Sequence, residues 1–162
     1  MQQTGHYGAA LVAYAPVGFV VAVLLSLELA AIGGVVAVVL SVLPDADMKT
    51  ARIAHRGVTH TVHFAVLVGG ILGLAGVVAG VRTNFGVPFV LGSLGFVIGT
   101  TAIASHIVVD ALTPMGVDPF LTGNRYSLSV TPAANPVANY ALLCLGIVAV
   151  VLAVGLASVV VA

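Results

Sequence analysis

The sequence predicts an all-α, polytopic membrane protein with about five transmembrane helices. Hydrophobic residues make up 60% of the 162 residues and charged residues only 6%. A soluble domain carries about 25% charged residues, because its surface must be solvated. Five basic and five acidic side chains cannot solvate a protein of this size, so lipid must cover most of its surface. This composition excludes a cytosolic enzyme, a disordered chain and a secreted disulfide scaffold.

Five apolar segments are long enough, or nearly so, to cross a bilayer, which takes about 20 residues. The second is the shortest, since its 15 residues at about 1.5 Å each reach only about 22 Å. We expect the five spans at residues 8–27, 29–43, 62–81, 87–109 and 137–162.

Glycines recur every three or four residues in the third and fourth predicted spans. Small residues at such spacing let helices approach closely in lipid. We therefore expect packing along these stripes, which comprise Gly69, Gly73, Gly76, Gly80, Gly92, Gly95 and Gly99.

Other general features narrow the class further. The single cysteine, Cys144, excludes an intramolecular disulfide and any cysteine-rich metal site. The net charge is zero and the sequence contains no basic cluster, so nothing in it indicates nucleic-acid binding. The N-terminus lacks the positive charge of a signal peptide, so we expect the first span to be retained. No repeat or linker divides the chain, which predicts a single membrane-embedded domain over residues 1–162.

The distribution of basic residues predicts the orientation. Five crossings put the N-terminus, residues 44–61 and residues 110–136 on one face, and the turn 82–86 on the other. Four of the five basic residues fall on the first face, against Arg82 alone on the second: Lys49, Arg52, Arg56 and Arg125. By the positive-inside rule, the first face is cytoplasmic in a plasma (inner) membrane.

Histidine and aspartate gather on that same face. All five histidines and four of the five carboxylates lie on it or just inside it. The long loops are on that side and explain part of this bias. They do not explain why the residues come in short clusters at the predicted helix ends.

The first cluster follows the second predicted span. Pro44 forbids continuation of the helix, and in an extended backbone Asp45 and Asp47 point the same way. Two such carboxylates repel each other unless a cation lies between them. A solvated loop that ends the helix is the alternative interpretation.

The second cluster opens the third span. His55, His60 and His63 fall within nine residues. Thr59 or Thr61 can cap the helix, which leaves His60 and His63 one helical turn apart. His6, just before the first predicted span, would by itself be an interfacial histidine.

The third cluster ends the fourth span. His106 and Asp110, at positions i and i+4, share one helical face and can share a ligand. Ionisable groups at the end of an apolar helix are costly and tend to be functional. A His–Asp hydrogen bond that only caps the helix is the alternative.

Together these clusters predict a metal centre. Imidazole nitrogen with carboxylate oxygen is a ligand set for zinc, manganese or iron(II) rather than calcium. There are more candidate ligands than one tetrahedral site needs, so we expect one or two divalent ions. Zinc is the metal expected first. Two ions can activate a water and hold the oxygens of a transferred group.

The motifs resemble those of the YdjM family, described as LexA-regulated, inner-membrane, metal-dependent hydrolases. The similar segments are 4–8, 43–47, 55–60, 106–110 and 112–116, so the resemblance covers residues 4 to about 118. Thr61 stands where the family usually has serine, which keeps the hydroxyl. The order of ligands is also similar, more loosely, to zinc-dependent phospholipase C and its related nucleases.

The resemblance, taken with the clusters, implies a hydrolase acting on a phosphoester, which could be a lipid, through a metal-activated water at the cytoplasmic membrane face. The expected metal ligands are His6, Asp45, Asp47, His60, His106 and Asp110. Arg56 is the candidate for stabilising charge on the transferred group, since Arg forks match phosphate oxygens. His55 or His63 could protonate the leaving group.

Three alternatives stay open at this point. A metal-ion carrier would need a polar path through the bilayer. A haem-binding module would need two facing histidines, such as His60 and His106. A purely structural membrane protein would leave the clusters unexplained. The partners expected are membrane lipid and a small-molecule or lipid phosphoester; the sequence does not predict the oligomeric state.

Overall fold

The structure, a computed structural model, describes residues 1–49 and 55–162. It is all-helical over these residues, apart from one isolated bridge between Val117 and Tyr126. The long helices are α1 (Gln3–Leu24), α2 (Leu27–Leu40), α3 (Val62–Gly80), α4 (Val87–Ala111) and α5 (Pro136–Val161), with two short 3-10 helices, η1 (Pro44–Lys49) and η2 (Val58–His60). Arg52, used above to orient the chain, lies outside the described residues.

The prediction of five membrane-spanning helices is confirmed. Five helical segments are long and apolar enough to cross a bilayer, and the second of them joins α2 to η1 as Leu27–Met48. Ser26 explains the break after α1, because its side chain accepts a hydrogen bond from Leu29 N at 3.1 Å and so caps α2. Leu40 ends α2 three residues earlier than expected.

The start of the first helix differs from the prediction. Helix α1 begins at Gln3, not at residue 8, so His6 lies within its first turns rather than before it. His6 is fully buried. Gly5 and His6 pack against protein instead of lipid although the start of the helix is polar, which is why hydropathy alone places the helix start too late.

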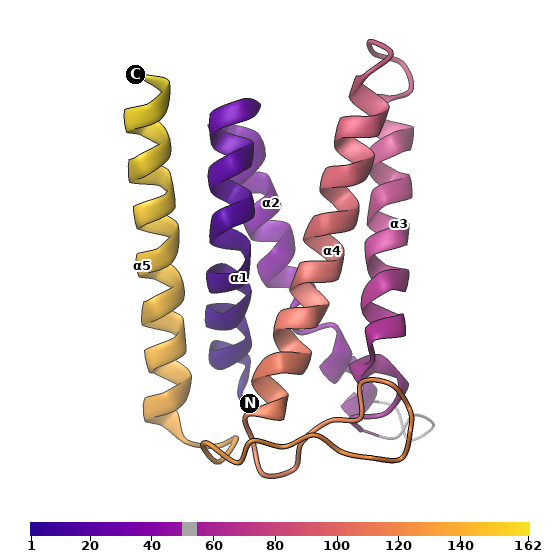
Figure 1. Ribbon diagram of the computed structural model, residues 1–162, viewed down its shortest axis with the longest axis vertical. Helices are drawn as coiled ribbons and strands as arrows, with labels where there is room; N and C mark the ends of the chain where they lie inside the picture. Colours follow the sequence, from indigo (N-terminus) through magenta and orange to yellow (C-terminus); the bar gives the residue numbers. More distant parts are fainter. Residues whose placement is uncertain (50–54) are drawn as a thin grey trace.

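The helices lie side by side with their axes roughly along one direction (Figure 1). Helix α3 packs on α4, and α1 packs on α5, α2 and α4. Glycines set the closest approaches, as expected: a Cβ on Gly99 would lie 2.9 Å from the Cα of Gly69, and one on Gly146 would lie 2.5 Å from the carbonyl oxygen of Gly8.

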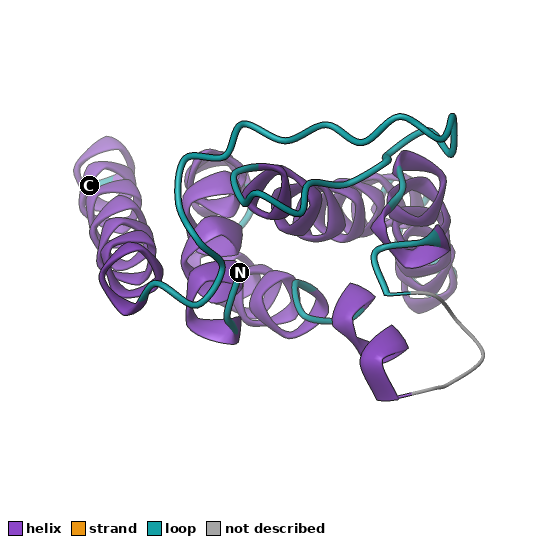
Figure 2. Cartoon of the chain, turned by 90° about the horizontal axis from the view of Figure 1, so that it is seen from below, coloured by secondary structure: helices purple, strands orange, loops and turns teal. Residues whose placement is uncertain are grey.

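The two ends of the bundle differ in what they carry. The N-terminus, η1, η2 and the connection between α4 and α5 lie at one end, and the α3–α4 turn and the C-terminus at the other (Figure 1). Seen from the first end, this long connection runs across α4 toward α5 (Figure 2). The helix packing therefore brings the start of α1 and the ends of α2 and α4 together beside η1 and η2.

Candidate metal centre

Three short segments bring four histidine and aspartate side chains together at this end of the bundle. Asp45 comes from η1, His60 from η2, and His106 and Asp110 from the last turns of α4. Each offers one ligand atom, and these atoms all lie within 4.8 Å of one another. We call these four residues the ligand cluster. All but Asp45 are buried.

Local structure explains how each segment presents its side chain. Helix α2 ends at Leu40, and Pro44 begins the short helix η1, which presents Asp45 to the ligand cluster. Thr61 caps α3, with its hydroxyl accepting from Phe64 N at 3.1 Å. His60 therefore precedes α3. Capping by Thr59, the other choice that the sequence allowed, would have placed His60 in the helix one turn before His63.

The distances within the ligand cluster match the edges of a metal coordination shell. His60 Nε2 lies 3.1 Å from His106 Nε2 and 3.5 Å from both Asp45 Oδ1 and Asp110 Oδ2. His106 Nε2 lies 3.5 Å from Asp45 Oδ1 and 3.6 Å from Asp110 Oδ2. Around a tetrahedral ion with metal–nitrogen bonds of about 2.0–2.1 Å, neighbouring donor atoms are about 3.3 Å apart. The cluster could therefore hold a divalent ion.

The hydrogen bonds of the two imidazoles assign their lone pairs. His106 Nδ1 lies 2.6 Å from the carbonyl oxygen of Ser41, which can only accept, so Nδ1 carries the proton. Thr59 donates its hydroxyl proton to Asp47 at 2.8 Å, and its oxygen can accept from His60 Nδ1 at 3.0 Å. Both neutral rings then present the Nε2 lone pair to the same point, an arrangement that requires a cation between them.

In the metal-free site, a proton can occupy this place. Burial alone would lower the pKa of His60, but hydrogen bonds to Asp110 and Asp45 and attraction from Asp110 and Asp47 outweigh it and raise the pKa above its ordinary value. The pKa of His60 is raised because the surrounding carboxylates favour a positive charge at this place, whether it is a proton or a metal ion.

A second group surrounds His60 from the outside. Asp47, His55 and His60 also place ligand atoms within 4.8 Å of one another, and we call these three residues the outer group. Asp47 accepts hydrogen bonds from His55 Nδ1 at 2.9 Å, from Thr59, and from Arg56 N at 3.2 Å. Its carboxylate thus pairs with donors on the loop that carries His60.

Arg56 binds the ligand cluster from the side. Its Nη2 lies 3.1 Å from Asp110 Oδ1, and its Nη1 donates to Thr113 Oγ1 at 2.9 Å and to the Gly116 carbonyl at 3.0 Å. Its backbone has a positive φ of 58°, a conformation that costs about 1–2 kcal/mol for a residue with a side chain. The guanidinium is buried, and its Nε–H has no hydrogen-bond partner among the described residues.

His6 lies on the other side of the ligand cluster. Its ring stacks on that of His106, with centroids 3.7 Å apart and planes 8° apart. Its Nε2 lies 3.2 Å from the carbonyl oxygen of Met1, and 3.7 Å and 3.6 Å from the outer carboxylate oxygens Asp45 Oδ2 and Asp110 Oδ1. The amino group of Met1 also donates to Asp110 Oδ1. Both carboxylates therefore offer one oxygen to the His60–His106 side and one to the His6 side.

His63 and Asp118 are also on this face, and they belong to neither group. His63 is exposed on the first turn of α3. Asp118 accepts from the backbone of Thr122 at 3.0 Å and of Gly123 at 2.6 Å. Burial alone would raise the pKa of Asp118, but these hydrogen bonds lower it overall. Its geometry is that of a loop-closing residue.

The family follows from comparison with known proteins. The model of the family described as YdjM inner membrane protein matches residues 1–162, the whole chain. The chain belongs to the YdjM family. Comparison with curated proteins gives no match, and comparison with solved structures gives none either. The YdjM-family chain is thus a multi-pass membrane protein with buried histidine and aspartate groups that could hold a metal ion.

The YdjM-family fold also uses residues that the sequence did not single out. Ser41 contributes its carbonyl to His106, and Thr113 and Gly116 hold the guanidinium of Arg56. A weak signal exists for Ser41, because the last carbonyls of a helix need partners outside it. Thr113 and Gly116 belong to one of the family-like motifs, but their contact with Arg56 spans 57 to 60 positions and leaves no local pattern.

Proposed function

We propose that the protein is a metal-dependent hydrolase that acts on a phosphoester at the membrane face carrying the ligand cluster. One observation carries this proposal: two imidazole Nε2 atoms face each other at 3.1 Å, with two carboxylates within 3.6 Å of them. Zinc is the ion that best suits this nitrogen–oxygen set, with manganese or iron(II) next.

The four residues of the ligand cluster would hold the first ion. A divalent ion held there would supply a water that ionises near neutral pH, the nucleophile that hydrolysis needs. His6, with the outer oxygens of Asp45 and Asp110, would form the position of a second ion once the Met1 carbonyl and amino group, which bond His6 Nε2 and Asp110 Oδ1 in this structure, are displaced. Asp47 orients His60 through Thr59, a role that outer carboxylates commonly have around metal-ligating histidines.

Arg56 has two roles in the proposed reaction. It holds Asp110 in place, and its free Nε–H is a buried donor that a phosphate oxygen can satisfy. Leaving a donor unpaired in a buried site is costly, so its presence favours an anionic ligand beside the cluster.

Protonation of the leaving group falls to His55 in this proposal. Its Nδ1 is bonded to Asp47, which orients the ring, and its side chain is 35% exposed, so a substrate can reach it. His63 is the less favoured candidate, since it lies outside both groups.

The arrangement disfavours the alternative functions. Nε2 atoms 3.1 Å apart leave no room for a haem macrocycle between His60 and His106. In the described spans, Glu28, exposed at the other end of the bundle, is the one acidic or histidine side chain away from the cluster end. A metal-ion carrier would need a polar path between the two ends. Among the described residues, Lys49, Arg56 and Arg125 lie on the cluster face against Arg82 on the other, which favours the cytoplasmic side for the cluster.

Hydrolysis of soluble aryl phosphates tests the proposal. We expect the zinc-loaded, detergent-purified protein to hydrolyse p-nitrophenyl phosphate or bis(p-nitrophenyl) phosphate. Asp110→Asn should lower the rate more than about 100-fold, because a ligand is lost. Asp118→Asn, the same change outside the cluster, should leave the rate unchanged. Equal rates in the two variants, or none in the metal-loaded wild type with any phosphoester, would refute the proposal.

A further inference from the structure

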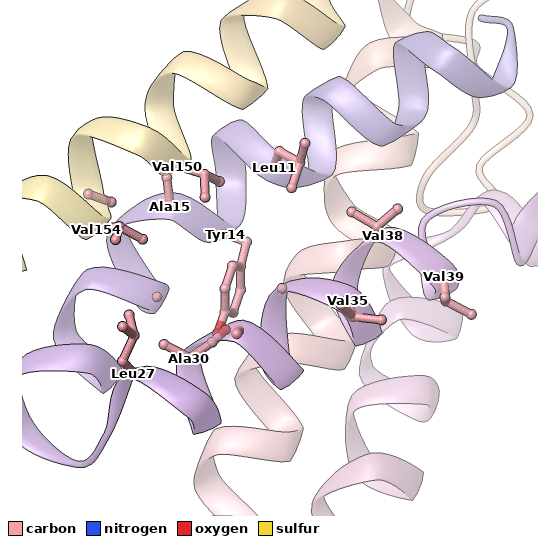
Figure 3. Close-up of a pocket in the computed structure, with 14 residues that line it drawn as sticks. Leu11, Tyr14, Ala15, Leu27, Ala30, Val35, Val38, Val39, Val150 and Val154 are labelled. Atoms are coloured by element: carbon pink, nitrogen blue, oxygen red, sulfur yellow. The ribbon is translucent and has the colours of Figure 1, made fainter.

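A groove lies between α1, α2 and α5, inside the membrane-spanning part of the bundle (Figure 3). Its volume is about 410 Å³, within the range of about 300–1,000 Å³ for ligand pockets. Fourteen residues line it, six of them alanine or glycine. These small side chains leave the space that larger ones would fill.

The groove is chemically a hydrocarbon site. The one polar side chain that lines it is Tyr14, whose hydroxyl donates to the Ala30 carbonyl at 2.7 Å and so has no hydrogen bond left to give. The ring of Tyr14 fits because Gly18 and Gly34 face it: a Cβ on either would lie 2.8 Å or 3.3 Å from the ring, respectively. A ligand here gains only apolar contacts.

The dimensions select a single chain rather than a helix. From Leu27 to Val39, the α2 wall of the groove is about 18 Å long, against about 15 Å for the hydrocarbon of one leaflet. Spread over this length, the volume gives a mean cross-section of about 23 Å². An α-helix with its side chains needs roughly 80 Å², so a second copy of the chain or a partner helix could lie over the groove but not within it, whereas a single hydrocarbon chain lies within it.

One end of the groove lies beside the metal-ligand residues. Leu11, Val38 and Val39 line that end. Ser41, two residues after Val39, gives its carbonyl to His106. On α1, His6 lies five residues before Leu11, a rise of about 7.5 Å, which is within the reach of a lipid headgroup.

We infer that the groove binds the hydrocarbon chain of a phospholipid substrate, with the phosphate headgroup directed toward the ligand cluster. This inference rests on the proposed function, whose substrate class it narrows from phosphoesters to membrane phospholipids. The chain lies along α2, with its end near Leu27 and Val154.

Photolabelling tests the position and direction of the chain. The probes are two phosphatidic acids, one with a diazirine near the ester of the acyl chain and one with it at the chain end. The protein is the full chain in detergent. We expect the first probe to label peptides around Leu11 and Val39, and the second to label those around Leu27 and Val154. Equal labelling of all lipid-facing helices, or the reverse order, would overturn the inference.

Ala31→Phe tests the groove itself, because this exposed alanine lines it. We expect the added ring to lower labelling of the groove about tenfold. Ala75→Phe makes the same change at an exposed position on α3, outside the groove, and should leave labelling unchanged. Equal bound zinc in both variants shows that each is folded. Unaltered labelling in Ala31→Phe would contradict the inference.

Activity separates this inference from the proposed function. Ala31→Phe should lower hydrolysis of dioleoyl phosphatidic acid about tenfold and leave that of a water-soluble aryl phosphate unchanged. Equal loss with both substrates would overturn the groove assignment while the hydrolase proposal stands. Groove labelling without hydrolysis of any phosphoester would overturn the hydrolase proposal and the substrate assignment, and leave a lipid-binding site.

Discussion

The ligand cluster and the outer group share His60 but differ in how their polar atoms are paired. In the ligand cluster, two imidazole Nε2 atoms and two carboxylates face one another, and only a proton or a metal ion between the rings can pair both lone pairs. In the outer group, Asp47 accepts from an imidazole, a hydroxyl and a backbone N–H, so donors and acceptors match. The ligand cluster therefore needs a cation to pair its polar atoms, whereas the outer group is already paired and orients His60.

Burial makes this difference matter. His60 and His106 are fully buried at the end of the membrane-spanning bundle, whereas the side chain of His55 is 35% exposed. Unpaired polar groups removed from water are costly, and ionisable groups in a membrane protein more so. A cation bound in the ligand cluster would offset this cost. The same ion would bind less favourably at the outer group, whose polar atoms are already paired.

The largest expected effect comes from removing the metal. Bound metal should stabilise the fold by about 4 kcal/mol at a free concentration about 1,000 times its Kd. Thermal unfolding in detergent, with zinc and after treatment with EDTA, measures this difference. Identical unfolding temperatures under both conditions would show that the ligand cluster needs a cation no more than the outer group does.

The second-largest expected effect comes from Asp47, the outer-group carboxylate that orients His60. Asp47→Asn should weaken zinc binding about 10- to 100-fold, because Asp47 orients Thr59 and, through it, His60. Asp118→Asn, on the same face but outside both groups, is the matched control and should leave affinity unchanged. Complete loss of zinc in Asp47→Asn would instead make Asp47 a direct ligand, as the sequence predicted.

The pH dependence of metal binding follows from the raised pKa of His60. Its proton stabilises the metal-free fold below the unfolded-state pKa, and this contribution is lost as pH rises through the folded-state pKa. Zinc needs the unprotonated ring, so affinity should rise up to about tenfold per pH unit below that pKa and level off above it. Zinc titrations between about pH 6 and pH 9 measure this curve, and a flat curve would exclude His60 as a ligand.

The smallest effects concern the exposed histidines. His55→Gln should change zinc affinity at most about fivefold, since partly exposed pairs contribute about 1 kcal/mol or less. His63→Gln should have no effect on zinc affinity, because His63 belongs to neither group. A larger loss in His63→Gln than in His55→Gln would show that the loop carrying His60 is arranged differently.

Much of the fold was predictable because apolar length is a local property. The third, fourth and fifth predicted spans match α3, α4 and α5 to within two residues at each end. The start of α1 was not predictable by hydropathy, since its first residues are polar and its buried His6 packs beside the ligand cluster. The pairing of His106 with Asp110 could be derived from helical spacing alone.

The contacts between distant segments could not be derived from the sequence. Capping by Thr61 decides that His60 turns inward and His63 outward, and the sequence allowed Thr59 as an equal choice. The Arg56–Asp110 pair, 3.1 Å apart, joins the loop before α3 to the end of α4. Such pairs depend on how the helices pack, which no local spacing encodes.

The metal content of the purified protein tests the central claim most directly. Mass spectrometry should find one or two equivalents of a transition metal, with zinc first, in the detergent-purified wild type. A His106→Ala/Asp110→Ala double variant that stays helical and monodisperse should have lost it. No metal in the wild type after reconstitution, or equal metal in the double variant, would contradict the account.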